Sequence, residues 1–321
     1  MKLRAKVAVS VGLLTLLLVL LPWHQVTAAL ARLSAGVWAA VLGGFVVGHT
    51  VGVFKWRMIV NAARASLGVA DAGLCYAAGL FANLCLPTIV GGDLLRMALA
   101  GRFTRRPEAA LFGGILDRIT DTTALGLLIL GGGLAARHAL PGWGGEALAV
   151  ALAVAVALVG AFLPLVLRRP LARWPRRLRR RVGRALVALR RIGRTPGTAL
   201  AALGLSFAIQ SGFVVLNAWL GWMIGIEVPL AVWFLVWPLA KVAALLPISL
   251  GGLAVREASL AALLVPFGVP AAMGVVCSLL WQTVMIAGGL LGGLVWLLLA
   301  QRRSRLGGPS PAESLSAARY A

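Results

Sequence analysis

The sequence is dominated by long apolar runs that are separated by short polar segments. The runs cover residues 7–22, 37–54, 73–100, 109–134, 146–167, 199–224, 230–268 and 271–300. About 20 apolar residues cross the hydrocarbon core of a bilayer as an α-helix, and only 12% of the residues are charged. We therefore expect an all-α integral membrane protein, a polytopic helical bundle without room for a soluble catalytic domain.

Basic residues outside the runs predict how the helices are oriented. The chain has 31 Lys and Arg against 9 Asp and Glu, and their densest cluster is the segment 168–194. Because Lys and Arg are enriched in cytoplasmic loops, this segment and both termini are predicted to be cytoplasmic, and Lys55 and Arg57 to mark the cytoplasmic end of the run 37–54. The basic segment is either a topology determinant or a surface helix that gathers anionic lipid. The clustering disfavours a nucleic-acid partner.

A short pattern occurs twice, with its second copy half a chain length after the first. It reads Leu-Pro, three residues, Gly-Gly, three residues and Arg, and its copies are residues 86–96 and 246–256. Paired Gly and Pro interruptions in corresponding halves of a membrane protein indicate a substrate site. The alternative is a chance match between two unrelated membrane halves.

The charge pattern gives the runs 73–100 and 230–268 an unusual topology. The first run is predicted to begin and end on the cytoplasmic side, and the second to begin and end outside. Half of such a run forms about 20 Å of helix, which reaches the bilayer middle without crossing comfortably. We therefore expect two re-entrant helical hairpins or pairs of short spans, added to six full spans. The result is an inverted-topology repeat with halves 1–135 and 136–300 and a disordered cytoplasmic tail, 301–321.

Charged residues within the apolar runs are candidate functional residues, because a charge inside a membrane is costly and marks a pathway or an internal partner. They are Asp93, Arg96, Asp117, Arg118, Asp121, Lys241, Arg256 and Glu257. Asp117, Arg118 and Asp121 share one helix, where residues three or four apart can pair. These three residues and Lys241 either couple and gate transport or form internal salt bridges that fix the hairpins.

The two Gly-Gly breaks are candidate anion sites. The predicted substrate-binding residues are Gly91, Gly92, Asp93, Arg96, Gly251, Gly252, Arg256 and Glu257. A helix that starts at such a break presents free N–H groups, and glycine permits an anion to approach closely. The Arg of each break adds a guanidinium that binds phosphate oxygens in a bidentate manner. Its acidic neighbour is expected either to neutralise the Arg when cargo is absent or to couple transport to protons.

Other polar and small residues give weaker indications. Gly44, Gly48 and Gly52 repeat every four residues, which favours close helix packing. His49 is expected either to relay protons or to bond a neighbouring helix. The three Cys residues have no CxxC or His spacing, so we predict neither a disulfide framework nor a metal site. We also expect no cofactor and no catalytic residue.

Three stretches of the chain together resemble a known family. Residues 86–96, 116–121 and 246–257 read LPTIVGGDLLR, LDRITD and LPISLGGLAVRE. They are similar to the signature stretches of the lysylphosphatidylglycerol synthase transmembrane-domain family, a flippase-like family, over about residues 5–300. A departure is Asp117, where the family commonly has Glu. The resemblance implies a multi-pass protein of a bacterial cytoplasmic membrane that translocates lipid, and without the aminoacyl-transferase domain it does not imply lipid aminoacylation.

Two classes of function agree with these features. For a transporter we expect a polar cavity, lined by both Gly-Gly tips, that binds an anionic phospholipid or lipid-linked precursor, so that membrane lipids are the partners. The alternative is a membrane enzyme or a non-transporting accessory protein in lipid or glycan assembly. An enzyme needs a nucleophile or metal cluster at the membrane edge, and no such pattern occurs in the sequence.

Overall fold

The computed structural model describes residues 23–85, 91–104, 106–136, 196–244 and 254–305, which form helices and no strand. The α-helices are α2 (Trp23–Arg32), α3 (Ala35–Ala62), α4 (Val69–Cys85), α5 (Gly91–Phe103), α6 (Pro107–Ala135), α9 (Pro196–Met223), α10 (Leu230–Ala243), α11 (Val255–Leu264) and α12 (Ala271–Arg305). A short 3-10 helix, η2 (Val265–Phe267), follows α11. The predicted all-α fold class is therefore confirmed.

Several predicted features lie outside the described residues. They are the runs 7–22 and 146–167, the basic segment 168–194, the Gly251-Gly252 break and most of the tail 301–321. The number of membrane spans therefore stays a prediction.

Within the described residues, three helices, α3, α9 and α12, are long and apolar enough to cross a membrane. α6 is also long, with 29 residues, and carries the charges of the predicted run 109–134. The run 37–54 lies within α3, but the helix continues to Ala62. The cytoplasmic end of this run stays a prediction, but Lys55 is buried inside the bundle and does not lie in an exposed loop. It can remain inside because carboxylates of α6 lie beside it.

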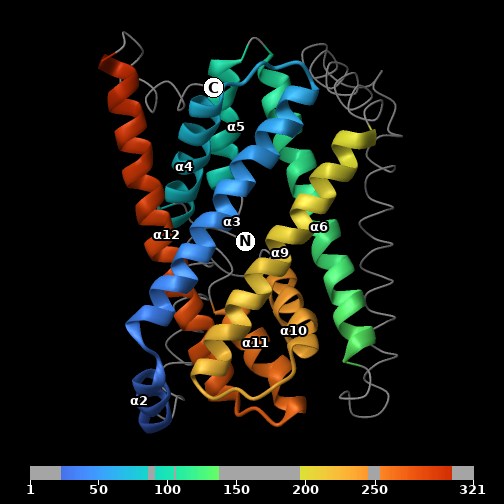
Figure 1. Ribbon diagram of the computed structural model, residues 1–321, viewed down its shortest axis with the longest axis vertical. Helices are drawn as coiled ribbons and strands as arrows, with labels where there is room; N and C mark the ends of the chain where they lie inside the picture. The colour runs from blue at the N-terminus through green and yellow to red at the C-terminus, as the bar shows by residue number, and fades with distance from the viewer. Residues whose placement is uncertain (1–22, 86–90, 105, 137–195, 245–253, 306–321) are drawn as a thin grey trace, which may run out of the picture.

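Each predicted hairpin run consists of two short helices. α4 and α5 lie side by side at one end of the helix bundle, and α10 and α11 lie at the opposite end (Figure 1). The first pair packs so closely that a Cβ added to Gly79 of α4 would lie 2.9 Å from the carbonyl oxygen of Gly92 in α5. α4 ends two residues before Pro87, a residue that cannot continue a helix without losing a backbone hydrogen bond.

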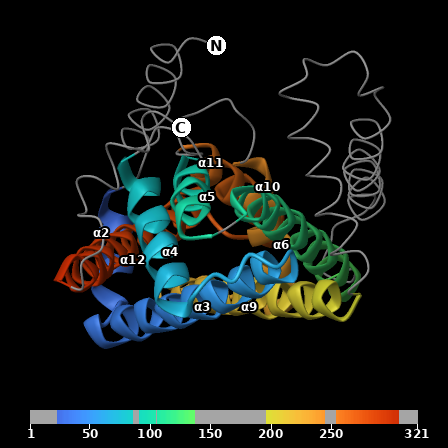
Figure 2. The ribbon, with the colours of Figure 1, turned by 90° about the horizontal axis from the view of Figure 1, so that it is seen from above.

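The helices form a layered arrangement when the bundle is seen from above. α3 and α9 pack together along one face, and the two pairs of short helices lie behind them, between α12 and α6 (Figure 2). Each short helix pair is therefore covered by long helices. This arrangement places the charged faces of α5 and α6 toward the inside of the bundle.

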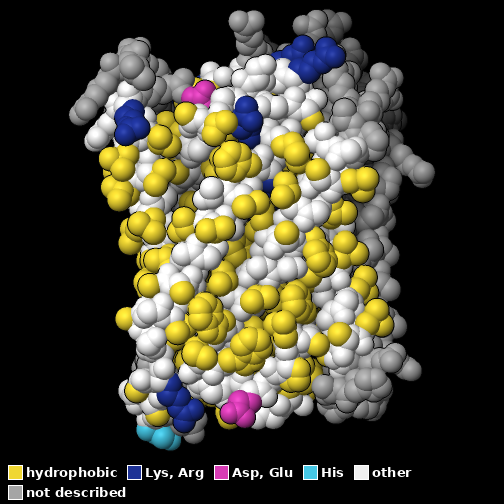
Figure 3. All heavy atoms as spheres, in the orientation of Figure 1, with side chains coloured by type: hydrophobic (Ala, Val, Ile, Leu, Met, Phe, Trp, Pro, Cys, Tyr) yellow, Lys and Arg dark blue, Asp and Glu magenta, His cyan; other side chains and the backbone are white. Residues whose placement is uncertain are grey.

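The outer surface has the distribution expected of a membrane protein. Hydrophobic side chains cover the middle of the face shown in Figure 3, and most charged side chains visible there lie toward its two ends. Val47 and Leu200 are 63% and 69% exposed on α3 and α9. Because hydrocarbon replaces water around such side chains in a bilayer, their exposure agrees with a membrane-embedded bundle.

The glycine repeat of α3 packs as predicted. A Cβ added to Gly44 or Gly48 would meet the side chain of Leu216 or Phe213 in α9, at 2.8 and 2.6 Å. A Cβ on Gly52 would lie 2.5 Å from the hydroxyl of Tyr76 in α4. These small residues let α3 approach both neighbours, as is common in membrane helix packing.

Candidate functional site

A cavity of about 150 Å³ lies between α3, α4, α5, α6, α9 and α10. Its charged lining residues are Lys55, Asp93, Arg96, Asp117, Arg118, Asp121 and Lys241. Its other polar lining residues include His49, Tyr76, Asn83, Thr122 and Gln210. The structure thus gathers most of the charged residues that the sequence singled out, together with Lys55.

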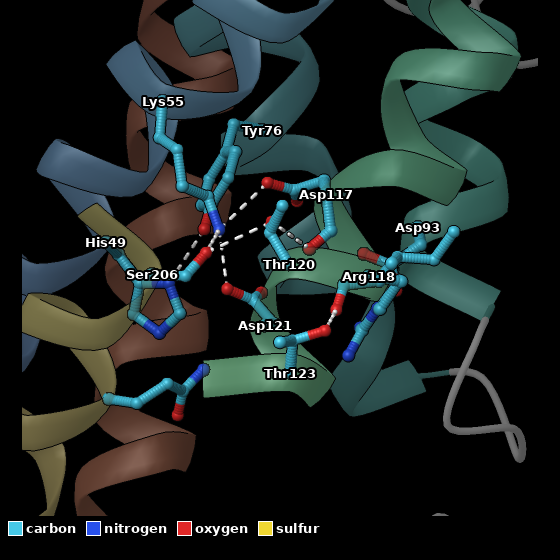
Figure 4. Close-up of polar contacts among 12 residues, drawn as sticks. His49, Lys55, Tyr76, Asp93, Asp117, Arg118, Thr120, Asp121, Thr123 and Ser206 are labelled. Carbon is cyan, nitrogen blue, oxygen red and sulfur yellow. Dashed lines mark hydrogen bonds and ion pairs between the residues drawn. The ribbon is translucent and has the colours of Figure 1, made fainter. Parts of the chain in front are cut away.

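Lys55 joins two carboxylates of α6. Its Nζ lies 3.0 Å from Asp117 Oδ1 and 2.5 Å from Asp121 Oδ1, and it donates a hydrogen bond of 2.9 Å to Ser206 Oγ of α9 (Figure 4). The Lys55 side chain is 3% exposed. Asp117 and Asp121 are one helical turn apart, so both can reach the same ammonium.

Arg96 is held between two carboxylates and two aromatic rings. Its Nη2 lies 3.0 Å from Asp117 Oδ2 and 3.2 Å from Asp93 Oδ1. The guanidinium carbon lies 4.8 Å from the ring centroids of both Trp56 and Tyr76, a distance at which an aromatic face attracts a cation. The internal salt bridge, one of the two interpretations of Arg96, is therefore the arrangement present in this structure.

Arg118 is the most exposed of the paired cations. Its Nε donates a hydrogen bond of 2.5 Å to Asp93 Oδ2, and its Nη2 forms an ion pair with the same oxygen. Its side chain is 45% exposed, whereas that of Asp93 is 10% exposed. Arg118 is therefore the cation that a ligand entering from outside the bundle reaches most easily.

Lys241 of α10 differs from the other cations of the cavity. Its Nζ donates a hydrogen bond of 2.7 Å to Gln210 Oε1 and lies 5.6 Å from the centroid of the Phe213 ring. Among the described residues, it forms no ion pair with a carboxylate, so the internal salt bridge, one of its two interpretations from the sequence, is not seen there. The neutral amide and the ring leave its positive charge without an anionic neighbour in direct contact.

The first Gly-Gly break packs against α4. Gly91 and Gly92 are buried at the start of α5, and the N–H of Gly92 donates a hydrogen bond of 3.0 Å to Asn83 Oδ1 of α4. Because this donor already has a partner, the glycine pair serves the packing of α4 against α5 in this structure. Gly251 and Gly252 lie outside the described residues.

Arg256 and Glu257 form a second cluster, and neither lines the cavity described above. Arg256 Nη2 lies 2.7 Å from Glu257 Oε1 and donates a hydrogen bond of 2.8 Å to Gln282 Oε1, while its Nε donates to Ser278 Oγ at 3.1 Å. Both partners outside α11 belong to α12. The two Arg residues of the repeated pattern therefore fix their short helices to different long helices and do not face one common cavity.

Aromatic residues border the cavity at His49. His49 Nδ1 is 3.2 Å from the hydroxyl of Tyr76 in α4, which agrees with a histidine that bonds a neighbouring helix. Its ring centroid lies 4.3 Å from that of Phe45 and 5.3 Å from that of Phe213. Trp281 packs against both Phe rings. The cavity therefore adjoins a block of packed aromatic side chains.

The lining residues that were missing from the sequence-based site include Lys55, Tyr76 and Gln210. Tyr76 and Gln210 are single polar residues within apolar runs, and this pattern is the signal that could have indicated them. Lys55 stands at the edge of its run, where a charge looks like the end of a span. Its role became visible only when α6 was placed beside α3.

The cavity can hold a small anionic group. Its lining contains the cations Lys55, Arg96, Arg118 and Lys241 and the carboxylates Asp93, Asp117 and Asp121, so its formal charge is positive. Among the described residues, no group of three or more His, Cys, Asp or Glu is placed to hold a metal ion. The charged and polar side chains of the lining can bind a ligand through charge complementarity and hydrogen bonds.

The chain was compared with known families and proteins. The family model of the lysylphosphatidylglycerol synthase TM region matches residues 4–293. No curated protein and no solved structure matches the chain significantly. The match covers most of the chain, including every helix that lines the cavity.

Proposed function

Because the chain belongs to the lysylphosphatidylglycerol synthase TM region family, a membrane domain associated with lipid handling, we propose that it is a lipid transporter. It moves an anionic phospholipid or lipid-linked precursor between the two leaflets of a membrane. The family resemblance suggests a bacterial cytoplasmic membrane, and the arginine-rich segment 168–194 favours an orientation with that segment and both termini inside.

The observation that carries this proposal is the charged cavity inside an apolar bundle. Charges within a membrane are costly and are retained where they line a pathway or bind a substrate. The cavity gathers charges from four helices, α3, α5, α6 and α10, and Arg118 at its more exposed side is accessible. The lining has one more cation than it has carboxylates, and this excess of positive charge suits an anionic head group.

The placement of the short helices supports a transport mechanism. α4–α5 and α10–α11 lie at opposite ends of the bundle (Figure 1), as expected for the two hairpins of an inverted repeat. Arg96 ties the first pair to α6, and Arg256 ties the second to α12. Rearrangement of one pair against its long helix is the movement by which we propose that the cavity opens to alternate sides.

The experiment is reconstitution of the purified protein into vesicles that contain lipids with a fluorescent acyl chain. Dithionite quenches only the outer leaflet, so protein-dependent quenching beyond that fraction reports lipid movement between leaflets. We expect such movement for an anionic phospholipid. Vesicles whose inner-leaflet lipids stay protected would contradict transport and favour an enzyme or accessory role.

A matched pair of cysteine variants tests whether the cavity is the pathway. Thr122 lines the cavity, whereas Thr123 is its exposed neighbour on α6. In a Cys85→Ala background, a bulky thiol reagent should stop lipid movement in Thr122→Cys and leave Thr123→Cys active. Equal inhibition of both variants would show that the reagent acts elsewhere than in the cavity.

A further inference from the structure

We propose that the cavity selects a lipid whose head group carries a single negative charge, and that Lys241 sets this selection. The cargo is then a phosphodiester lipid of the phosphatidylglycerol type, not a zwitterionic, cationic or diphosphate lipid. This inference rests on the transport function proposed above and adds the charge class of the cargo and the residue that reads it.

The first step is the pairing of charges in the lining. Lys55 contacts Asp117 and Asp121, Arg96 contacts Asp117 and Asp93, and Arg118 contacts Asp93. These contacts join three cations and three carboxylates in one closed group. The formal charges of this group cancel, so the group has no net charge that would attract a ligand.

The second step is the position of Lys241. Its contacts are the Gln210 amide oxygen at 2.7 Å and the Phe213 ring at 5.6 Å, and within the described part of the chain no carboxylate approaches within ion-pair distance. Glu257, the acidic residue of the neighbouring helix α11, is bonded to Arg256 instead. A lysine ammonium has three N–H donors, and only one of them has a partner here. Among the described residues of the lining, Lys241 therefore has N–H donors without an acceptor and a positive charge without an ion-pair partner.

The third step is the charge balance of the occupied cavity. A buried charge without a counter-charge is strongly unfavourable. A phosphodiester monoanion neutralises the lining, whereas a zwitterion leaves one positive charge and a diphosphate adds excess negative charge.

The phosphodiester group could come from a lipid or from a soluble ester such as glycerophosphoglycerol. We propose the lipid as the source, because exposed apolar side chains lie on the outer faces of the long helices, where lipids would contact the bundle. The test therefore includes both sources, with a radiolabelled soluble diester offered to the same vesicles.

The experiment measures dithionite quenching of acyl-labelled phosphatidylglycerol and phosphatidylethanolamine in separate vesicle preparations. The variants are Lys241→Gln, Lys241→Arg and Gln210→Glu. Gln210→Glu keeps the lysine and places a carboxylate at its present partner, so it cancels the charge by an independent route if Lys241→Gln fails to fold. Arg64→Gln, at an exposed position outside the cavity, is the control for loss of one positive charge.

We expect the natural protein to move phosphatidylglycerol in preference to phosphatidylethanolamine. Lys241→Gln and Gln210→Glu should lower phosphatidylglycerol movement by about tenfold or more, as for loss of a charge-assisted hydrogen bond, and abolish the preference. Lys241→Arg and Arg64→Gln should keep the preference, and the soluble diester should not be taken up.

The failures of the two proposals are distinguishable. Equal movement of both lipids by the natural protein, or a preference unchanged in both charge-cancelling variants, would overturn the charge selection and leave transport intact. Absence of any lipid movement would overturn the transport function itself. Uptake of the soluble diester without lipid movement would reassign the cavity to a solute.

Discussion

At the scale of single residues, the charges of the cavity depend on one another for their stability. Lys55 is shared by Asp117 and Asp121, and Arg96 by Asp93 and Asp117. Removing one partner of a buried ion pair costs about 3–5 kcal/mol, because the remaining charge is left without compensation. Removing both partners costs much less.

Lys55→Gln is therefore expected to destabilise the protein by about 3–5 kcal/mol. Adding Asp121→Asn should recover part of this loss, because Asp117 still pairs with Arg96. Thermal unfolding of the detergent-solubilised variants, followed by tryptophan fluorescence, measures both effects. Arg64→Gln should change stability by less than about 0.5 kcal/mol, and an equally small effect of Lys55→Gln would refute the paired role of Lys55.

Arg96→Gln should likewise lose stability and transport, because it leaves Asp93 with only the exposed Arg118. The double variant Asp93→Asn with Arg96→Gln should restore folding and lipid movement if Arg96 serves as an internal salt bridge. Unfolding temperature and dithionite quenching are measured on the same preparations. A double variant that folds but moves no lipid would instead show that the guanidinium contacts the cargo.

The sequence identified most charges of the cavity, because a charge inside an apolar run is visible without a structure. It also predicted that Asp93 neutralises Arg96, which the structure confirms, but it did not predict the partners that come from other helices. Arg96 looked like an anion ligand since it follows a Gly-Gly break, yet its closest carboxylate, Asp117, belongs to α6, whose position is set by tertiary packing. Lys55 was missed for the same reason: its partners lie 62 and 66 residues further along the chain.

At the scale of helices, the apolar runs predicted the elements well. The runs 109–134 and 271–300 correspond to α6 and α12, and the run 73–100 divides into α4 and α5. The helix α2 was not predicted, because it is short and mixes polar with apolar residues. Length and polarity are local properties, whereas the hydrogen bond from Gly92 to Asn83 depends on the contact of two helices.

The close packing of α4 against α5 yields a prediction about glycine. In Gly79→Ala the new Cβ would lie 2.9 Å from a backbone oxygen of α5, so the two helices must separate, at a cost of about 1–3 kcal/mol. Gly43→Ala is the control, because nothing lies within 4 Å of its added Cβ and alanine favours a helix. Unfolding temperatures should fall for the first variant and not for the second, and equal values would contradict the packing role.

At the scale of the whole molecule, each end of the bundle contains one pair of short helices. The turn between α5 and α6 and the turn between α9 and α10 lie at opposite ends (Figure 1). Arg102 and Arg106 flank the first of these turns, and Glu227 lies in the second. Because Arg is enriched on the cytoplasmic side, we predict that the first turn lies inside and the second outside.

Cysteine labelling in cells tests this orientation. Arg106 and Glu227 are exposed, whereas Cys75 and Cys277 are buried, so Cys85→Ala provides a quiet background. A membrane-impermeant maleimide should label Glu227→Cys in intact cells and Arg106→Cys only after the membrane is opened. Because an inverted repeat brings its hairpins in from opposite faces, the two positions must differ in access. Labelling of both from the same side would refute the inverted repeat, and a reversed pattern would refute the cytoplasmic placement of the arginines.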